Sequence, residues 1–365
     1  MKKRVLIVTA GFGEGHNTAA KNIRAALLSE NPDSEVLISD LYAVTNPRLN
    51  RMMQAGYRFA INRATTIWHT IYKAFDYPGA IESTLPLIAK MRDAFLRQIE
   101  SFRPDAVVST YPIYGFVKDE ITKKGNAFTM PFFTMVTDST LINSAWYRRP
   151  STAFLVPDQP TKDCLLRKGV DEKIIHALGF PVALCFENLR PVLPDATPPW
   201  KVLIMPSTRR SVALRILTAV LARKDTTATI VAGRCQYVLD GLENSPFSKD
   251  PRCKILGWTD KMPELLAEHH LFIGKAGGAT VQEAIAAQCP ILISHVVPGQ
   301  EEGNIALILQ NQIGALANTN ELMKNSLDLA FDHEAATWRN WKCNIAQHSR
   351  CDASRNIARF ILTNC

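Results

Sequence analysis

The chain has 365 residues, of which 47% are hydrophobic and 21% charged, and its formal net charge at pH 7 is +8. Because this length exceeds what one ordinary hydrophobic core encloses, it predicts two domains. The composition is that of a globular protein, and no apolar run approaches the roughly 20 residues that span a bilayer, which argues against a membrane-spanning protein. The apolar run 5–8 after the basic start is too short for a signal peptide and predicts a first strand.

Short apolar runs alternate with longer helical patterns along the whole chain. In the first half the predicted strands are 5–9, 36–39, 106–109, 132–136 and 153–156. In the second half they are 202–205, 228–231, 254–256, 271–273 and 291–294. Strands that alternate with helices in this way indicate α/β domains with parallel, doubly wound sheets.

A proline-rich segment, 187–199, separates the two sets of strands. Its prolines forbid regular structure and predict a stiff connector. We therefore expect an N-terminal domain over 1–186 and a C-terminal domain over 200–365. The sequence leaves open whether the last helix returns to the N-terminal domain.

The cysteines are scattered along the chain, with no CxxC pair and no spacing typical of metal ligands. This pattern favours reduced cytosolic thiols. We therefore expect no metal site.

Glycine-rich loops follow two of the predicted strands, at the positions where open α/β sheets bind their ligands. The first loop carries Gly11, Gly13 and Gly15, which do not match the GxGxxG spacing of a dinucleotide site. No acidic residue is clearly placed about 20 residues later to bind a ribose. An NAD-dependent enzyme therefore fits poorly.

The second loop follows the strand 271–273 and precedes a helix expected to open at Thr280. Its small residues let a phosphate approach backbone N–H groups at the positive end of the helix dipole; they are Gly277, Gly278 and Ala279. A diphosphate fits there without a metal ion. Alternatively, Thr280 and Glu283 form a capping box, which satisfies helix N–H groups with no ligand.

A further turn, 298–304, follows the strand 291–294 and offers polar side chains beside the second loop. We expect them to bind the hydroxyl groups of a hexose; they are Gln300, Glu301 and Asn304. They could equally be ordinary residues of a first helical turn.

His16 ends the first glycine-rich loop, and the ordinary histidine pKa of about 6.5 suits it to take a proton from an alcohol. Sugar transfer with inversion needs such a base, together with positive charge for the departing diphosphate. Asp138 is the competing base, either acting directly or orienting His16. His16 is our first choice, and the alternative is that it only caps a helix that begins near Asn17.

Residues 45–73 are rich in basic and aromatic side chains and contain no acidic residue. Such a segment is typical of a helix that lies in the headgroup region of an anionic bilayer, and the positive net charge agrees. The alternatives are a solvated helix face and a nucleic-acid site, but no nucleic-acid-binding motif accompanies the segment. We assign four of its residues to membrane contact: Arg51, Arg58, Arg63 and Trp68.

Several segments together resemble one family. The matching segments, in order, are GFGEGHNTAA at 11–20, Thr137-Asp138, Trp146, GFPV at 179–182 and GWTDKMPEL at 257–265. With the paired GGxTxxEA and PGQExxN motifs, they resemble the monogalactosyldiacylglycerol synthases and processive diacylglycerol glucosyltransferases, which are related to the peptidoglycan glycosyltransferase MurG. The resemblance covers nearly the whole chain.

This resemblance implies a GT-B fold, in which two Rossmann-like, doubly wound α/β domains face each other across a cleft. The C-terminal domain then holds a nucleotide sugar, with Glu283 on the ribose hydroxyls and the PGQE segment on the sugar, and we add Trp258 to this donor side. The N-terminal domain then binds a lipid acceptor, and we assign Gly13 and Gly15 to that side.

The chain departs from the family where the strand 202–205 ends. The family has a glycine-rich turn there, whereas this chain has Arg209 and Arg210. Either guanidinium could neutralise the leaving diphosphate in place of backbone N–H groups, or both could be solvated surface residues.

We therefore expect an inverting hexosyltransferase that moves glucose or galactose from UDP-glucose or UDP-galactose to diacylglycerol, with no cofactor and no metal ion. The expected partners include an anionic membrane surface and no nucleic acid. The expected location is cytoplasmic, peripheral on the inner face of the cell membrane. The alternatives are a MurG-like transferase that acts on a polyprenyl-linked cell-wall intermediate and a soluble UDP-sugar epimerase, which has no use for the basic segment.

Overall fold

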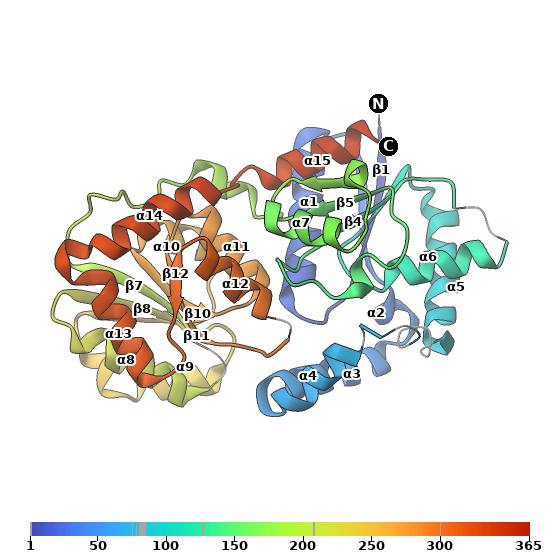
Figure 1. Ribbon diagram of the computed structural model, residues 1–365. Coiled ribbons are helices and arrows are strands. Elements are labelled where there is room, and N and C mark those ends of the chain that lie inside the picture. Colours follow the sequence, from blue (N-terminus) through green and yellow to red (C-terminus); the bar gives the residue numbers. More distant parts are fainter. Residues whose placement is uncertain are drawn as a thin grey trace. The chain divides into compact units, whose positions relative to one another are not determined.

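The computed structural model describes residues 2–74, 76–77, 79, 85–125, 128–206, 209–299 and 301–365; at 62, 63, 65, 67, 71 and 85–87 only the backbone is described. The chain forms two compact units (Figure 1). Unit 1 comprises Met1–Leu184, Pro298–Gly303 and Asp352–Cys365. Unit 2 comprises Cys185–Val297 and Asn304–Cys351.

This division differs from the predicted domains in two respects, and it also answers the open question about the last helix. The first boundary falls after Leu184, so the proline-rich segment 187–199 is part of unit 2. The short segment Pro298–Gly303, which we had placed in the C-terminal domain, belongs to unit 1. The last helix, α15 (Ala353–Thr363), also belongs to unit 1, where it packs against α1 (Glu14–Glu30).

The part of unit 1 that the structure describes contains a parallel six-stranded sheet with the strand order β2-β1-β3-β4-β5-β6. Its strands are β1 (Arg4–Thr9), β2 (Glu35–Asp40), β3 (Ala106–Ser109), β4 (Phe132–Met135), β5 (Ala153–Val156) and β6 (Ile175–Ala177). The other helical segments are α2 (Leu41–Thr45), α3 (Pro47–Arg63), α4 (Thr65–Ala74), α5 (Leu85–Phe102), α6 (Tyr114–Lys123), α7 (Gln159–Arg167), η2 (Ser144–Trp146) and η3 (Glu172–Ile174).

The described part of unit 2 contains a second parallel six-stranded sheet, with the order β12-β11-β10-β7-β8-β9. Its strands are β7 (Trp200–Met205), β8 (Thr226–Val231), β9 (Cys253–Leu256), β10 (Leu271–Lys275), β11 (Ile291–His295) and β12 (Gly314–Leu316). Its helical segments are η4 (Leu184–Asn188), α8 (Arg210–Ala222), α9 (Gln236–Glu243), η5 (Pro246–Lys249), α10 (Met262–Glu268), α11 (Gly278–Ala286), α12 (Glu302–Gln310), α13 (Asn320–Phe331), η6 (His333–Ala335) and α14 (Ala336–His348).

All ten predicted strands are present, with ends within two residues of the prediction, and the predicted parallel pairing is confirmed. In each sheet the strand order reverses beside the first strand, between β1 and β3 in unit 1 and between β7 and β10 in unit 2. Ligands of doubly wound sheets bind at the carboxyl ends of the strands next to this reversal. The loops after these strands are therefore the first places to look for a site.

The first strand of unit 1 buries both of its faces. Leu6 and Val8 lie in a cluster with α5 and α6, whereas Val5 and Ile7 lie in a cluster with α1 and α15. Each such side chain contributes about 1.5–3 kcal/mol when it is fully buried. A central strand covered on both faces fixes the position of the loop that follows it.

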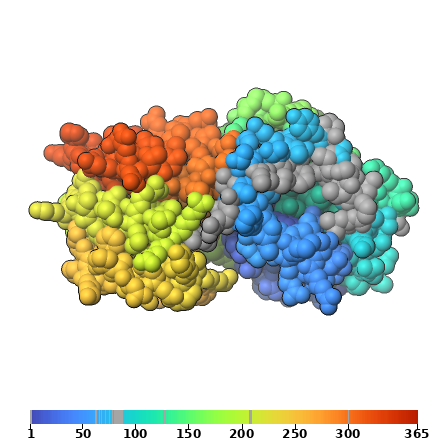
Figure 2. All heavy atoms as spheres, turned by 90° about the horizontal axis from the view of Figure 1, so that it is seen from below, coloured from blue at the N-terminus to red at the C-terminus, as the bar shows by residue number. Residues whose placement is uncertain are grey.

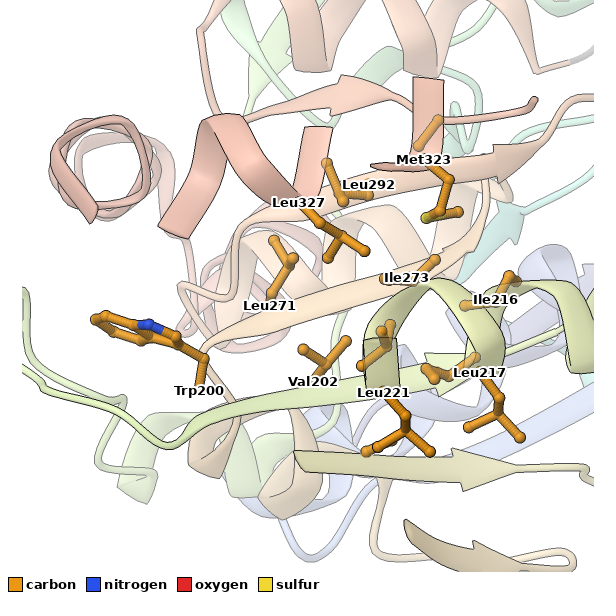
Figure 3. Packing of buried hydrophobic residues seen from close by; sticks show 14 of the residues in the cluster. Trp200, Val202, Ile216, Leu217, Leu221, Leu271, Ile273, Leu292, Met323 and Leu327 are labelled. Carbon is orange, nitrogen blue, oxygen red and sulfur yellow. The ribbon is translucent and has the colours of Figure 1, made fainter. Parts of the chain in front are cut away.

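The core of unit 2 lies between its sheet and neighbouring helices (Figure 3). Val202 and Ile273 come from adjacent strands and pack with Leu217 of α8, and Leu271 packs with Leu327 of α13. Side chains two residues apart on a strand share one face, which is why these alternate residues meet the helices.

None of the helices within the described residues combines the length and the apolar composition needed to cross a lipid bilayer.

Candidate functional site

Three adjacent strands of unit 1 place polar residues at one edge of the sheet. His16 follows β1 in the first turn of α1, Thr110 follows β3, and Thr137 and Asp138 follow β4. Because β1, β3 and β4 are neighbours in the sheet, these residues meet although they are far apart in the chain.

The imidazole of His16 is buried and held through one nitrogen. Its Nδ1 lies 2.8 Å from the carbonyl oxygen of Thr110 and 2.9 Å from Oγ1 of Thr137. A carbonyl oxygen only accepts, so Nδ1 carries the proton and Nε2 carries a lone pair. Burial lowers the pKa of His16 to about 4, against the opposing effect of the hydrogen bond to Thr110. The ring is therefore neutral near pH 7, with Nε2 as its basic atom.

The half-buried carboxylate of Asp138 accepts a hydrogen bond from the indole Nε1–H of Trp146, at 2.8 Å. Burial raises the pKa of Asp138 to about 6, and the bond from Trp146 acts in the opposite direction. The indole also lies 6.0 Å from the ring of His16, measured between centroids. Both candidate bases are thus arranged around one side chain, that of Trp146.

Two of the alternatives for His16 are wrong. The helix begins at Glu14 rather than near Asn17, with Gly13 as its N-cap and no side-chain cap, so His16 lies inside the first turn and does not cap it. Asp138 does not orient the ring, because Nδ1 is held by Thr110 and Thr137.

The glycine-rich loop before α1 is held in place by a hydrogen bond from its backbone. The N–H of Gly11 donates to Oδ2 of Asp40, at 3.1 Å. A Cβ atom at Gly11 would lie 2.4 Å from Nε2 of Gln54, so a larger residue there requires the Gln54 side chain to move. Gly13 has a φ of +99°, a backbone conformation that glycine adopts without strain, and Gly15 lies in the first turn of α1.

Helices α3 and α4 carry the residues that we assigned to membrane contact. Figure 2 shows them, in blue, around a hollow in this face of unit 1. Arg51 and Arg58 are exposed on α3, and Trp68 on α4 packs edge-on against Tyr57, with 4.9 Å between ring centroids. The side chain of Arg63 lies outside the described part.

In unit 2, α11 begins at Gly278, two residues before the predicted start. Its N-cap is Gly277, and no side chain caps the helix. The capping box predicted from Thr280 and Glu283 is therefore not formed. The first N–H groups of α11, at the small residues of the loop including Ala279, remain available to an anion.

Glu283 lies one turn further along α11 and is half-buried. No hydrogen bond to its carboxylate is formed by any residue that the structure describes. Burial raises the pKa of Glu283 to about 7. An unsatisfied carboxylate close to a helix N-terminus can accept hydrogen bonds from the hydroxyl groups of a ribose.

The residues of the turn after β11 are divided between the units. Asn304, in the first turn of α12, donates from Nδ2 to the carbonyl oxygen of Ala276, at 2.8 Å, and so fastens α12 to the loop before α11. Glu301 is buried and belongs to unit 1, and Gln300 lies outside the described residues. Of the residues predicted to bind the hexose, Glu301 thus belongs to unit 1 and Asn304 to unit 2.

Trp258 and Arg209 complete the candidate donor residues. The ring of Trp258 is 59% exposed, with the guanidinium of Arg234 5.2 Å from its centroid. Arg209 is exposed at the N-cap of α8. Arg210 lies within α8, and its side chain packs against Gly241 of α9.

Sequence reasoning missed the residues that hold His16. Thr110 directly follows the buried strand β3, and Thr137 comes two residues after the end of β4. Polar residues directly after buried strands could have indicated them, as they did for Asp138.

Residues 16–182 match the model of a family described as monogalactosyldiacylglycerol (MGDG) synthase. The chloroplastic monogalactosyldiacylglycerol synthase of Spinacia oleracea is 24% identical over 96% of this chain and 70% of its own length. The processive diacylglycerol beta-glucosyltransferase of Bacillus subtilis (strain 168) is 25% identical over 99% of this chain and 95% of its own length.

Solved structures resemble the chain along its whole length. The glycotransferase of kitacinnamycin has a TM-score of 0.67 at 12% identity and covers 100% of this chain and 99% of its own. The UDP-GlcNAc 2-epimerase of Neisseria meningitidis, bound to UDP-GlcNAc, has a TM-score of 0.61 at 13% identity, with 100% of both chains covered. A spinosyn rhamnosyltransferase complexed with spinosyn aglycone has a TM-score of 0.61 at 15% identity, with 99% of both chains covered. These similarities confirm the predicted GT-B α/β fold, which transferases and an epimerase share.

Proposed function

We propose that the chain is a member of the family of monogalactosyldiacylglycerol synthases and processive diacylglycerol glucosyltransferases, and that it transfers a hexose from a UDP-sugar to diacylglycerol. The observation that carries the proposal is that neutral His16 and Asp138 both lie beside Trp146 at the strand ends of unit 1. A base of this kind removes the proton of an acceptor hydroxyl.

In the proposed step, the hydroxyl oxygen of diacylglycerol bonds to the anomeric carbon as the bond from that carbon to the diphosphate oxygen breaks. The proton goes to Nε2 of His16 or to the carboxylate of Asp138, and UDP leaves with the electron pair. Attack from the face opposite the leaving group inverts the anomeric carbon. Asp138, with its pKa of about 6, is mostly ionised at pH 7 and accepts the proton more readily than His16.

We propose that unit 2 binds the donor through α11. Its uncapped N-terminus offers N–H groups and a positive dipole end to the diphosphate, and Glu283 binds the ribose. No metal ion is required in this arrangement, so EDTA should leave the transfer rate unchanged. A rate that falls with EDTA and returns with Mg²⁺ would refute the proposal that transfer needs no metal ion.

We place the reaction at an anionic membrane surface, with the protein peripheral on the cytoplasmic face. One side of α3 supports this, because basic and large apolar residues are exposed together at helical spacing: Arg48, Arg51, Met52 and Phe59. Met52 and Phe59 are 67% and 65% exposed. Such a surface suits lipid phosphates and the interface beneath them.

The decisive experiment incubates purified protein and diacylglycerol vesicles with UDP-glucose or UDP-galactose, followed by mass analysis of the lipids. We expect a hexosyl-diacylglycerol with one of the two donors. Conversion of the UDP-sugar in the absence of lipid would favour the epimerase, and transfer only to a polyprenyl-linked acceptor would favour the MurG-like activity. No glycolipid with any donor refutes the proposal.

A further inference from the structure

Helix α4 carries buried polar atoms that have no hydrogen-bond partner among the described residues. They are Nε1 of Trp68, Nδ1 of His69 and Oη of Tyr72. Trp68 and Tyr72 are four positions apart and therefore share one face of the helix, with 6.4 Å between ring centroids. Buried polar atoms are rarely left unpaired, so their concentration on one helix points to a ligand.

The end of α4 is attached to the segment that holds Asp138. Nδ2 of Asn143 donates to the backbone carbonyl of Tyr72, at 3.1 Å, and the N–H of Ser144 donates to Oδ1 of Asp76, at 2.8 Å. The same segment continues into Trp146, the hydrogen-bond donor to Asp138. Burial and the nearby Asp138 carboxylate raise the pKa of Tyr72, which keeps its hydroxyl protonated as a donor.

The turn that carries the PGQE motif contacts the same helix. A Cβ atom at Gly299 would lie 3.0 Å from Cδ1 of Tyr72 and 3.0 Å from Nδ1 of His69. All of these residues belong to unit 1. Helix α4 therefore adjoins both the segment with the candidate base and the turn that we assign to the sugar.

The surroundings of these donors are aromatic. Trp68 packs edge-on against Tyr57, and Tyr57 packs edge-on against Phe12 of the glycine-rich loop, with 6.2 Å between ring centroids. A hexose hydroxyl needs donors and acceptors around it. An ester carbonyl only accepts, is flanked by acyl chains, and so matches isolated N–H and O–H donors in an aromatic wall.

We propose that Nε1–H of Trp68 and Oη–H of Tyr72 form a subsite for the ester carbonyl oxygens of the acceptor lipid, which holds its free hydroxyl toward Asp138. This inference rests on the proposed function, since it assigns the acceptor end of that reaction. It adds two residues that select a diester glycerol from other lipid alcohols.

The test compares diacylglycerol with a dialkylglycerol of the same chain length, which keeps the hydroxyl and lacks both carbonyls. Wild-type protein should use the diester about 10-fold better in kcat/KM, because a subsite built to donate discriminates against a ligand without the acceptor. Trp68→Phe and Tyr72→Phe should each remove most of this preference without changing the KM for UDP-sugar. Tyr77→Phe is the control, because that side chain is 70% exposed.

Thermal unfolding separates this role from a structural one. Since the hydroxyl of Tyr72 is buried and unpaired, Tyr72→Phe should melt at the same temperature as wild type or higher. A lower melting temperature with equal loss on both lipids would overturn the subsite, as would a Phe variant that keeps the diester preference. If wild type transfers sugar to neither lipid, the proposed function fails and the subsite with it.

Discussion

Nδ1 of His16 and the carbonyl oxygen of Thr110 lie 2.8 Å apart, across two neighbouring strand ends of unit 1. This contact keeps the imidazole proton on Nδ1 and leaves Nε2 as a base or hydrogen-bond acceptor. It also explains why His16 can be buried without an ion-pair partner, since its ring is neutral.

If His16 takes the proton, removal of its imidazole should impair turnover without loss of nucleotide binding. In that case His16→Ala should lower kcat by about 100- to 10,000-fold, the range of general-base catalysis. UDP affinity, measured by calorimetry, should change little, because the residues proposed to bind the nucleotide belong to unit 2.

His16→Asn is the matched control for this experiment. Its amide N–H can replace Nδ1–H toward Thr110, but it has no atom equivalent to Nε2. The variant should fold as wild type and be inactive. A His16→Asn enzyme with substantial activity would remove His16 from the chemistry.

The pH dependence of kcat/KM distinguishes the two candidate bases. A base works only when it is deprotonated, so the rate falls as the pH drops through its pKa. The acid limb should lie near pH 6 if Asp138 takes the proton and near pH 4 if His16 does.

Trp146→Phe adds an independent check of this assignment. The variant loses the N–H that donates to Asp138 and lowers the pKa of that carboxylate. If Asp138 is the base, the acid limb should move to a pH above 6. A limb that is unchanged by Trp146→Phe would contradict this role.

Glu283→Gln should weaken the binding of UDP by about 10- to 100-fold, the effect of losing hydrogen bonds to a charged group. The same substitution should stabilise the ligand-free protein. The folded-state pKa of about 7 lies above the ordinary 4.5, so the native state binds more protons and stability falls as the pH rises through this interval.

The advantage of Glu283→Gln in thermal unfolding should therefore be larger at pH 8 than at pH 5. Glu243→Gln, on an exposed residue of the same unit, is the control and should show no such dependence. Equal melting temperatures of Glu283→Gln and wild type at both pH values would count against an unsatisfied carboxylate.

Charge reversal on α3 should weaken binding to anionic vesicles. Each basic residue near such a surface contributes about 1 kcal/mol, or about fivefold in affinity, so Arg51→Glu with Arg58→Glu should lower binding by at least 25-fold on that basis. Lys168→Glu, at the exposed C-cap of α7, is the control. Sedimentation with neutral and anionic vesicles measures the effect. Equal binding of the wild-type protein to both kinds of vesicle would rule out an electrostatic attraction to anionic lipids.

The sheets were predictable because buried parallel strands are nearly continuous apolar runs. The two strands that the sequence did not predict, β6 and β12, are three-residue edge strands that contain His176 and Gly314 and lack such a run. The start of α11 was placed too late because Gly278 and Ala279 carry no periodic apolar signal. The N-cap of α11 is nevertheless a glycine, Gly277, which makes no side-chain cap hydrogen bond.

The arrangement around His16 was not predictable from the chain alone. Thr110 is 94 residues away, and it reaches His16 only because β3 pairs directly with β1. Strand order in a doubly wound sheet is a tertiary property, so no local pattern indicates which strand ends adjoin. The same holds for Tyr72, whose position beside the Asp138 segment depends on a hydrogen bond from Asn143.

Unit 1 is closed by the helix that lies furthest along the chain. Ile357, Ala358 and Ile361 of α15 cover the apolar face of α1, in a cluster that includes Ile23 and Leu27. During synthesis, all of unit 2 leaves the ribosome before this helix does, and until then that face of α1 has no cover. A fragment that stops after Leu184 should therefore aggregate, whereas the same fragment with α15 supplied in trans should gain solubility. The core of unit 1 can therefore be completed only after unit 2 has been synthesised.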